Sequence, residues 1–181
     1  MQSKAYSRSI SDVRTRRFTL AIGVLPLLAA AALAFATGGL AQDETKVKAG
    51  LTAWKTTGCS DCHGPFADGD KQRDEAPTGA NLRQTRLDNA TIAETIRCGR
   101  PGAGMPSFGE DAYTPRGCYG QPAGSVPDDL YPASRKLSAQ EIDAVVTYLR
   151  ARIVGRRAVT PQECAYYYEE NAANFCDDPA K

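Results

Sequence analysis

Apolar residues recur at helical intervals in three stretches of the chain. In the first stretch, Val47, Leu51 and Trp54 lie four and three residues apart, so they share one face of a helix predicted over residues 43–57. A helix with one apolar face buries that face in a core. The first stretch therefore predicts packing against another element of the fold.

A longer apolar face is predicted near the C-terminal end of the chain. Ser138 and Glu141 have the spacing of a capping box, which marks the beginning of a helix, and the periodicity continues to about residues 151–153. The apolar face consists of Ile142, Val145, Val146, Leu149 and Ile153. A face of this width is typical of a helix that packs on a core.

A shorter helix is predicted between these two, over residues 89–98. Ile92 and Ile96 lie on one side of it, and Asp88 or Asn89 would cap its N-terminus. The segments on either side lack helical periodicity and are rich in Gly, Pro and polar residues, which predicts loops.

Two further segments lie outside the predicted helices: a long loop and a C-terminal extension. Residues 109–136 form a Pro/Gly-rich excursion, and a loop of that length is expected to be functional or to add packing. Residues 156–181 follow the last helix and contain Tyr166-Tyr167-Tyr168. We expect this extension to lie against the rest of the protein, with a docking surface as the alternative.

The N-terminal segment has the pattern of an export signal. Arg14, Arg16 and Arg17 precede an apolar run over residues 18–36, and Gly39-Leu40-Ala41 supplies small residues for cleavage. We therefore predict a signal peptide over residues 1–41 and a periplasmic location. The apolar run is also long enough to cross a membrane, so retention as an inner-membrane anchor stays open.

One short run carries the strongest chemical signal. Cys59-Ser60-Asp61-Cys62-His63 has the C-x-x-C-H spacing of covalent haem attachment, in which the thiols bind the vinyl groups and the histidine binds iron. A C-x-x-C pair also occurs in thioredoxin-like dithiols and zinc sites. His63 is the only histidine, which excludes a Cys₂His₂ site, and no strand–helix–strand pattern surrounds the pair. The predicted cofactor is one covalent haem c.

The second iron ligand follows from composition. Haem iron in electron carriers chiefly takes His or Met as its second ligand, and no second histidine exists. Of the two methionines, Met1 begins the N-terminal segment, which leaves Met105. The glycines before Met105 and Pro106 after it suit a loop held close to a porphyrin. The alternatives are a gap-filling Met105 and an open or water-bound iron.

The remaining cysteines predict disulfides. Cys98, Cys118, Cys164 and Cys176 are an even number in an exported chain, which indicates two bridges with three possible pairings. We favour the sequential pairing, Cys98 with Cys118 and Cys164 with Cys176. The first bridge would close a loop that contains Met105.

Charge excludes one class of partner. The whole chain carries +1, and residues 1–41 contain five basic residues and one acidic residue, which leaves 17 basic and 20 acidic residues beyond them. A chain with this balance has no general affinity for nucleic acid. Four arginines precede the Met105 loop and would either steer an acidic redox partner or form a solvated surface: Arg83, Arg86, Arg97 and Arg100.

The run Cys59–Gly64, followed by Gly104-Met105-Pro106, resembles class I cytochromes c over about residues 43–154. The resemblance implies an all-α fold in which an N-terminal and a C-terminal helix cross around one covalently bound haem. It also implies His63 and Met105 as the axial ligands. With the cysteine pairs added, we expect a haem domain over residues 42–155 with a disulfide-stapled loop and tail.

The resemblance implies two structural details. A glycine and an aromatic residue at the spacing of Gly50 and Trp54 allow the crossing helices to touch, here at Tyr148 and Leu149. Family members often have Gly-Pro-Asn-Leu in the loop after the haem motif, where the proline carbonyl orients the histidine. This chain has Gly79-Ala80-Asn81-Leu82 instead. Pro77 is then the candidate partner of the histidine.

The implied function is electron transfer rather than catalysis. A periplasmic dehydrogenase would donate electrons, and an oxidase or another cytochrome would accept them. The run from Ile96 to Pro106, with the four extra cysteines, is similar to c-type cytochromes described as methanol metabolism-related, which implies a quinoprotein alcohol dehydrogenase as donor. The alternatives are a membrane-anchored haem subunit of a respiratory complex and a haem enzyme or gas-binding protein with displaceable Met105.

Overall fold

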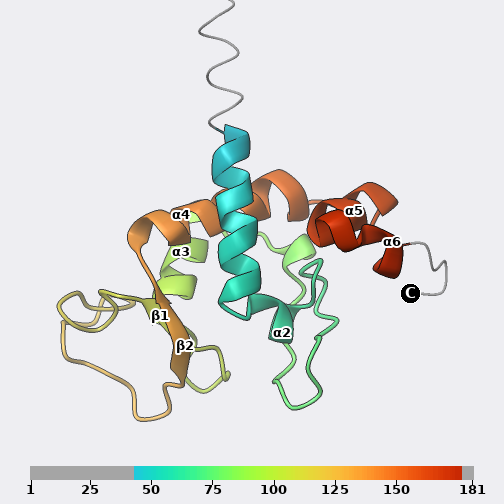
Figure 1. Cartoon of the computed structure of the whole chain (residues 1–181). Coiled ribbons are helices and arrows are strands. Elements are labelled where there is room, and N and C mark those ends of the chain that lie inside the picture. Colours follow the sequence, from blue (N-terminus) through green and yellow to red (C-terminus); the bar gives the residue numbers. More distant parts are fainter. Residues whose placement is uncertain (1–42, 177–181) are drawn as a thin grey trace, which may run out of the picture. The chain divides into compact units, whose positions relative to one another are not determined.

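The computed structural model of the protein describes residues 43–176 (Figure 1). The predicted signal peptide lies outside the described residues, so its cleavage or retention stays a prediction. Within residues 43–176, none of the helices combines the length and the hydropathy that a bilayer crossing requires.

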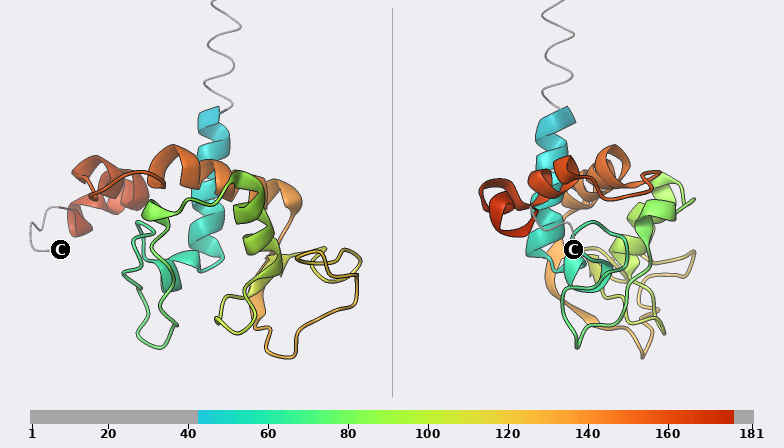
Figure 2. Two further views of the ribbon diagram at one scale, coloured as in Figure 1. Left: turned by 180° about the vertical axis from the view of Figure 1, so that it is seen from behind. Right: turned by 90° about the vertical axis from the view of Figure 1, so that its right-hand side faces the viewer.

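Two crossing helices form the centre of the core. The first helix covers residues 43–56, and α4 (Ala139–Tyr148) runs across it, as Figures 1 and 2 show from three sides. A single π-helical turn, η2 (Leu149–Ile153), extends α4. Both helices lie where their periodic patterns predicted them. The capping box is formed, because the side chains of Ser138 and Glu141 each accept from the other's backbone N–H.

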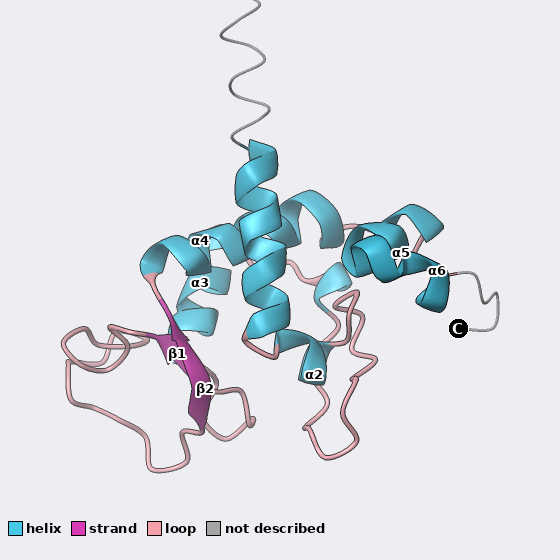
Figure 3. Ribbon diagram, viewed as in Figure 1, coloured by secondary structure: helices cyan, strands magenta, loops and turns pink. Residues whose placement is uncertain are grey.

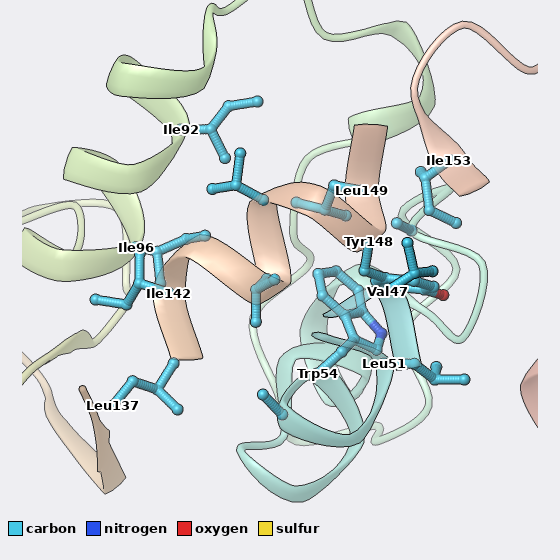
Figure 4. Packing of buried hydrophobic residues seen from close by; sticks show 14 of the residues in the cluster. Val47, Leu51, Trp54, Ile92, Ile96, Leu137, Ile142, Tyr148, Leu149 and Ile153 are labelled. Atoms are coloured by element: carbon cyan, nitrogen blue, oxygen red, sulfur yellow. The ribbon is translucent and has the colours of Figure 1, made fainter. Parts of the chain in front are cut away.

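Gly50 sets the distance between the two helices. A Cβ atom on Gly50 would lie 2.0 Å from the carbonyl oxygen of Ala144 and 2.7 Å from Cβ of Tyr148. Only a residue without a side chain fits there. Trp54, one turn further along, has its ring 6.2 Å from the ring of Tyr148 (Figure 4). The crossing that the resemblance implied is therefore present at the expected residues.

The core continues from the crossing to α3 (Asn89–Cys98), which lies beside α4. Asp88 caps α3, since its side chain accepts a hydrogen bond from the N–H of Thr91 at 2.8 Å. Figure 4 shows the α3 isoleucines packed toward the α4 side of the core. The buried side chains of this part of the core are Ile92, Ile96, Leu137, Ile142, Val145 and Leu149.

The remaining helical elements of residues 43–176 are short (Figure 3). They are α2 (Cys59–His63), η1 (Leu82–Gln84), α5 (Pro161–Tyr168), η3 (Glu169–Asn171) and α6 (Ala172–Phe175). The last three form the C-terminal extension, and α5 begins with its own capping box, from Thr160 and Glu163.

The expected all-α class holds for the helical content but misses a small sheet. Strands β1 (Ser107–Gly109) and β2 (Pro132–Leu137) pair in parallel, at opposite ends of the long excursion. Lys136 Nζ also donates to the carbonyl oxygen of Ser107 at 2.7 Å. The sequence of β2, Pro-Ala-Ser-Arg-Lys-Leu, does not alternate apolar and polar residue types, so it did not predict a strand.

The extension packs on the first helix, as expected from the sequence. Tyr166 donates from its hydroxyl to Glu44 at 3.1 Å, and Lys55 pairs with Glu169 at 3.1 Å. The disulfide Cys164–Cys176 closes the extension on itself. The other predicted bridge, between Cys98 and Cys118, is also present, so the sequential pairing is the one found.

Substitution of Gly50 by Ala tests the helix crossing. Alanine has the higher helix propensity by about 1 kcal/mol, yet its Cβ would force α4 away, and overpacking of this kind costs about 1–3 kcal/mol. We expect a lower melting temperature for Gly50→Ala. The exposed Lys48 on the same helix provides the control, and Lys48→Ala should leave the melting temperature nearly unchanged. Equal melting temperatures for all three proteins would contradict a close contact at Gly50.

Candidate functional site

A cavity of about 790 Å³ opens between the end of the first helix, α2, α3 and α4. Its volume lies within the range of roughly 300–1,000 Å³ that small-molecule and cofactor sites occupy. Four residues singled out from the sequence line it together: Cys59, Cys62, His63 and Met105. Apolar side chains such as Ile92, Ile96 and Leu149 form much of the remaining wall.

The C-x-x-C-H run forms α2, a single helical turn. The first helix ends at a turn through Thr57 and Gly58, and Gly58 has a φ of 76°, a left-handed conformation that glycine adopts without strain. This turn separates the first helix from α2, which begins at Cys59. The rings of Trp54 and His63 are 5.9 Å apart.

The imidazole of His63 is oriented by a backbone carbonyl. Its Nδ1 lies 2.8 Å from the carbonyl oxygen of Ala80. A carbonyl oxygen can only accept, so Nδ1 carries the proton and Nε2 keeps a free lone pair. Burial lowers the pKa of His63, which favours this neutral form, while the hydrogen bond to Ala80 opposes the shift. A neutral imidazole with a free Nε2 is the form that binds a metal.

Ala80, not Pro77, is therefore the partner of His63, and the expectation for Pro77 was wrong. Ala80 stands where family members have proline, and only its backbone carbonyl is used, so alanine can supply the same atom. Pro77 lies beside the Met105 loop instead, since a Cβ on Gly104 would be 3.4 Å from Pro77 Cγ.

Gly79 makes the approach of Ala80 possible. Its N–H donates to the carbonyl oxygen of Cys62 at 2.8 Å, which ties the loop to α2. A Cβ on Gly79 would lie 2.6 Å from Nδ1 of His63 and 2.9 Å from the same carbonyl oxygen. Any larger residue would push the loop, and with it the Ala80 carbonyl, away from His63.

The two thiols of α2 lack the lowered pKa of a thioredoxin-like dithiol. Cys59 and Cys62 are not joined by a disulfide. Burial raises the pKa of the Cys59 thiol to about 12, and burial together with Asp61 raises the pKa of Cys62. Thioredoxin-like motifs lower this pKa to activate a thiolate. Among residues 43–176 there is also no cluster of three His, Cys, Asp or Glu groups suited to a metal ion.

Met105 lies on a tight loop after α3. The N–H of Arg100 donates to the carbonyl oxygen of Met105 at 2.9 Å, which closes the loop at its base. Gly102 and Gly104 have φ values of 73° and 74°, so glycine is favoured at both turns of the loop. The Met105 side chain is partly buried and packs on the main core.

A second, smaller cluster of buried residues supports the beginning of this loop. Cys98, Tyr113 and Cys118 are buried together, and the Tyr113 hydroxyl donates to the carbonyl oxygen of Cys98 at 3.0 Å. The hydroxyl of Tyr119 donates to the carbonyl oxygen of Gly99. The long excursion thus adds packing beside the Met105 loop, one of the two roles expected for it.

The four arginines before Met105 do not form one solvated surface. Arg83 and Arg97 are only 3% and 8% exposed, while Arg86 and Arg100 are exposed. Arg97 donates to the carbonyl oxygen of Gly117 at 2.8 Å, so it supports the excursion. Arg83 and Arg97 therefore have neither of the two expected roles, because both are buried and their guanidinium groups donate to backbone carbonyls and pair with carboxylates.

Two residues at or near this site, Ala80 and Arg83, carried little signal in the sequence. Ala80 was recognisable only from its place in the Gly79–Leu82 run. Arg83 looked like a surface charge, because its acceptors come from segments far away in the chain.

The fold and the cavity fit a c-type cytochrome, and a comparison with protein families supports this class. Residues 45–117 match the family described as cytochrome c oxidase, cbb3-type, subunit III. No curated protein and no solved structure matches the chain. The match covers the C-x-x-C-H run and Met105, and it supports a covalently bound haem c and a role in electron transfer.

The described residues fit such a haem. Two thiols, an imidazole with a free Nε2 and a thioether line one largely apolar cavity. Trp54 Nε1 and Thr57 Oγ1 are buried without a hydrogen-bond partner, and both residues also line the cavity. Unpaired buried polar atoms indicate that water or a bound group completes the site.

Removal of the bridge beside Met105 should weaken the loop selectively. Cys98→Ala with Cys118→Ala removes a closure across 20 residues, worth roughly 3 kcal/mol in the chain-entropy model. We expect a lower melting temperature and more proteolytic cleavage within residues 99–117. The matched control, Cys164→Ala with Cys176→Ala, should loosen only the extension. Cleavage in the extension alone for both variants would contradict a clamping role for Cys98–Cys118.

Proposed function

We propose that this protein is an exported carrier of single electrons with one covalently bound haem c. Cys59 and Cys62 would hold the haem through thioether bonds, and His63 and Met105 would be the axial ligands of its iron. The observation that supports the proposal is one cavity lined by Met105 and by the C-x-x-C-H run, in which the Nδ1 atom of His63 is held by the Ala80 carbonyl.

The chain's own residues would keep the redox site rigid. A bound haem supplies reversible one-electron chemistry between ferric and ferrous iron. Ala80 holds the Nδ1 proton of His63 and so fixes the ring orientation. The apolar cavity wall excludes water, and the Met105 loop is held by Arg100 and the Cys98–Cys118 bridge. Fixed ligands oppose rearrangement during transfer, which suits a carrier.

The proposed donor is a periplasmic dehydrogenase, with an oxidase or another cytochrome as acceptor. The similarity of the segment from Ile96 to Pro106 to methanol metabolism-related cytochromes supports a quinoprotein methanol or alcohol dehydrogenase as donor. Methionine ligation supports the direction of transfer, since it raises the reduction potential of a haem.

A second candidate function is a haem subunit of a respiratory complex. The family match supports it, because the matching family is described as a subunit of a cbb3-type oxidase. In that case the apolar run over residues 18–36 would remain as a membrane anchor.

Absorption spectroscopy tests the axial ligands. The wild-type protein should show the far-red methionine–iron band when ferric and should not bind carbon monoxide when ferrous. Met105→Ala should lose the band and gain carbon monoxide binding, because it removes the only methionine in residues 43–176. Leu87→Ala alters an exposed lining residue without ligand atoms and should keep the wild-type spectrum. Persistence of the band in Met105→Ala would contradict methionine ligation.

Mass spectrometry of the native protein separates the two functions. Cleavage at or near Ala41, with one haem added and Cys98, Cys118, Cys164 and Cys176 oxidised, is expected for the soluble carrier. An intact N-terminus in a membrane fraction would favour the anchored subunit. A mass without haem would contradict both.

A further inference from the structure

Arg83 is the most completely bonded charged side chain near the cavity. Its side chain is 2% exposed. Nε donates to the carbonyl oxygen of Arg156 at 3.2 Å, Nη1 to that of Phe66 at 3.2 Å, and Nη2 to that of Ala158 at 2.7 Å. Nη2 also lies 3.3 Å from both carboxylate oxygens of Glu163. The planar guanidinium thus holds several backbone carbonyls and one carboxylate at fixed positions relative to one another.

The partners of Arg83 come from three separate segments. Phe66 belongs to the loop directly after the haem motif. Arg156 and Ala158 lie in the connection that follows η2, and Glu163 belongs to α5 of the extension. Burial of this charge is tolerated because each of its nitrogens has an acceptor. Loss of one partner would therefore loosen all three segments together.

Arg83 also lies three residues after Ala80, whose carbonyl orients His63. The segment between them is stiff: the side chain of Asn81 accepts from the Arg83 N–H at 3.0 Å, and the Leu82 N–H donates to the Ala67 carbonyl at 2.8 Å. The Arg83 carbonyl in turn accepts from the Gly155 N–H at 2.9 Å. The position of Ala80 is thus tied through η1 to the guanidinium.

Glu163 is held in place by groups other than Arg83. One of its oxygens accepts from the Thr160 N–H at 2.9 Å, and Arg156 Nε lies 3.7 Å from the other. Its side chain is 12% exposed. The carboxylate thus belongs to the start of α5 and serves as a fixed counter-charge for Arg83.

We propose that Arg83 and Glu163 are positioning residues for His63, through which the C-terminal extension tunes the iron site. The pair holds η1, and η1 holds the Ala80 carbonyl on Nδ1 of His63. This inference rests on the proposed function, in which His63 is an iron ligand. A firm hydrogen bond at Nδ1 makes an imidazole more basic and stabilises ferric iron, which lowers the reduction potential.

Two variants test the pair. Glu163→Gln removes the counter-charge but keeps the shape of the side chain, and Arg83→Lys keeps the charge but loses the fork of donors. Both should raise the reduction potential, with Arg83→Lys the larger. At a fixed solution potential, the ratio of reduced to oxidised haem should rise about threefold or more. For a one-electron couple, a tenfold rise in this ratio corresponds to about 59 mV in the reduction potential.

The matched control is Glu169→Gln. Glu169 also joins the extension to the rest of the protein, but through Lys55 of the first helix and not through the Arg83–Glu163 pair. The control should leave the reduction potential unchanged. A shift in Glu169→Gln as large as in Glu163→Gln would overturn the proposal, because any loosening of the extension would then suffice.

A second measurement is independent of electron transfer. Proton exchange at His63 Nδ1, followed by NMR, should become faster in both variants, while the backbone amides of α4 keep their wild-type rates. Unchanged exchange and potential in folded Glu163→Gln and Arg83→Lys would overturn the positioning role. A wild-type protein without haem would contradict the proposed function instead, and Nδ1 exchange would still test the pair. If Arg83→Lys does not fold, the reduction potential and the Nδ1 exchange rate of Glu163→Gln alone test the proposal.

Discussion

The contact between the first helix and α4 at Gly50 is the constraint on which the rest of the structure depends. With the Ala144 carbonyl at the Gly50 backbone, Trp54 meets Tyr148, and the turn through Thr57 and Gly58 leads into α2, whose His63 ring lies 5.9 Å from the ring of Trp54. The position of His63 relative to α4 is therefore fixed by a residue without a side chain. A wider crossing would separate the α2 wall of the cavity from the wall that α3 and α4 provide.

Each side of the cavity has its own support. On the histidine side, Gly79, Ala80 and Arg83 connect α2 to the extension through backbone carbonyls and one buried ion pair. On the methionine side, the Cys98–Cys118 bridge and the tyrosines around it hold the loop. The residues named for the histidine side and for the methionine side are different. Substitutions on one side are therefore expected to leave the packing of the other side intact.

The sequence predicted the parts of this protein that depend on local pattern. The helices followed from apolar spacing and from the Ser138 and Asp88 caps, and the sequential cysteine pairing, which was favoured among three, is the one found. The parallel pairing of β1 and β2 had no such signal, because Lys136 and Ser107 meet only after the excursion returns. Arg83 was misjudged for the same reason: a buried arginine and a surface arginine look alike until their acceptors are placed.

The size of the cavity also links folding to the cofactor. A space of about 790 Å³ at the centre of so small a core removes contacts that its lining residues would otherwise make. A ligand that fills the space stabilises the folded chain only while it is bound, to an extent set by its concentration and affinity. Thioether bonds at Cys59 and Cys62 would remove that dependence, because a covalently bound haem cannot dissociate. The stability of the folded chain would then not fall when the protein is diluted.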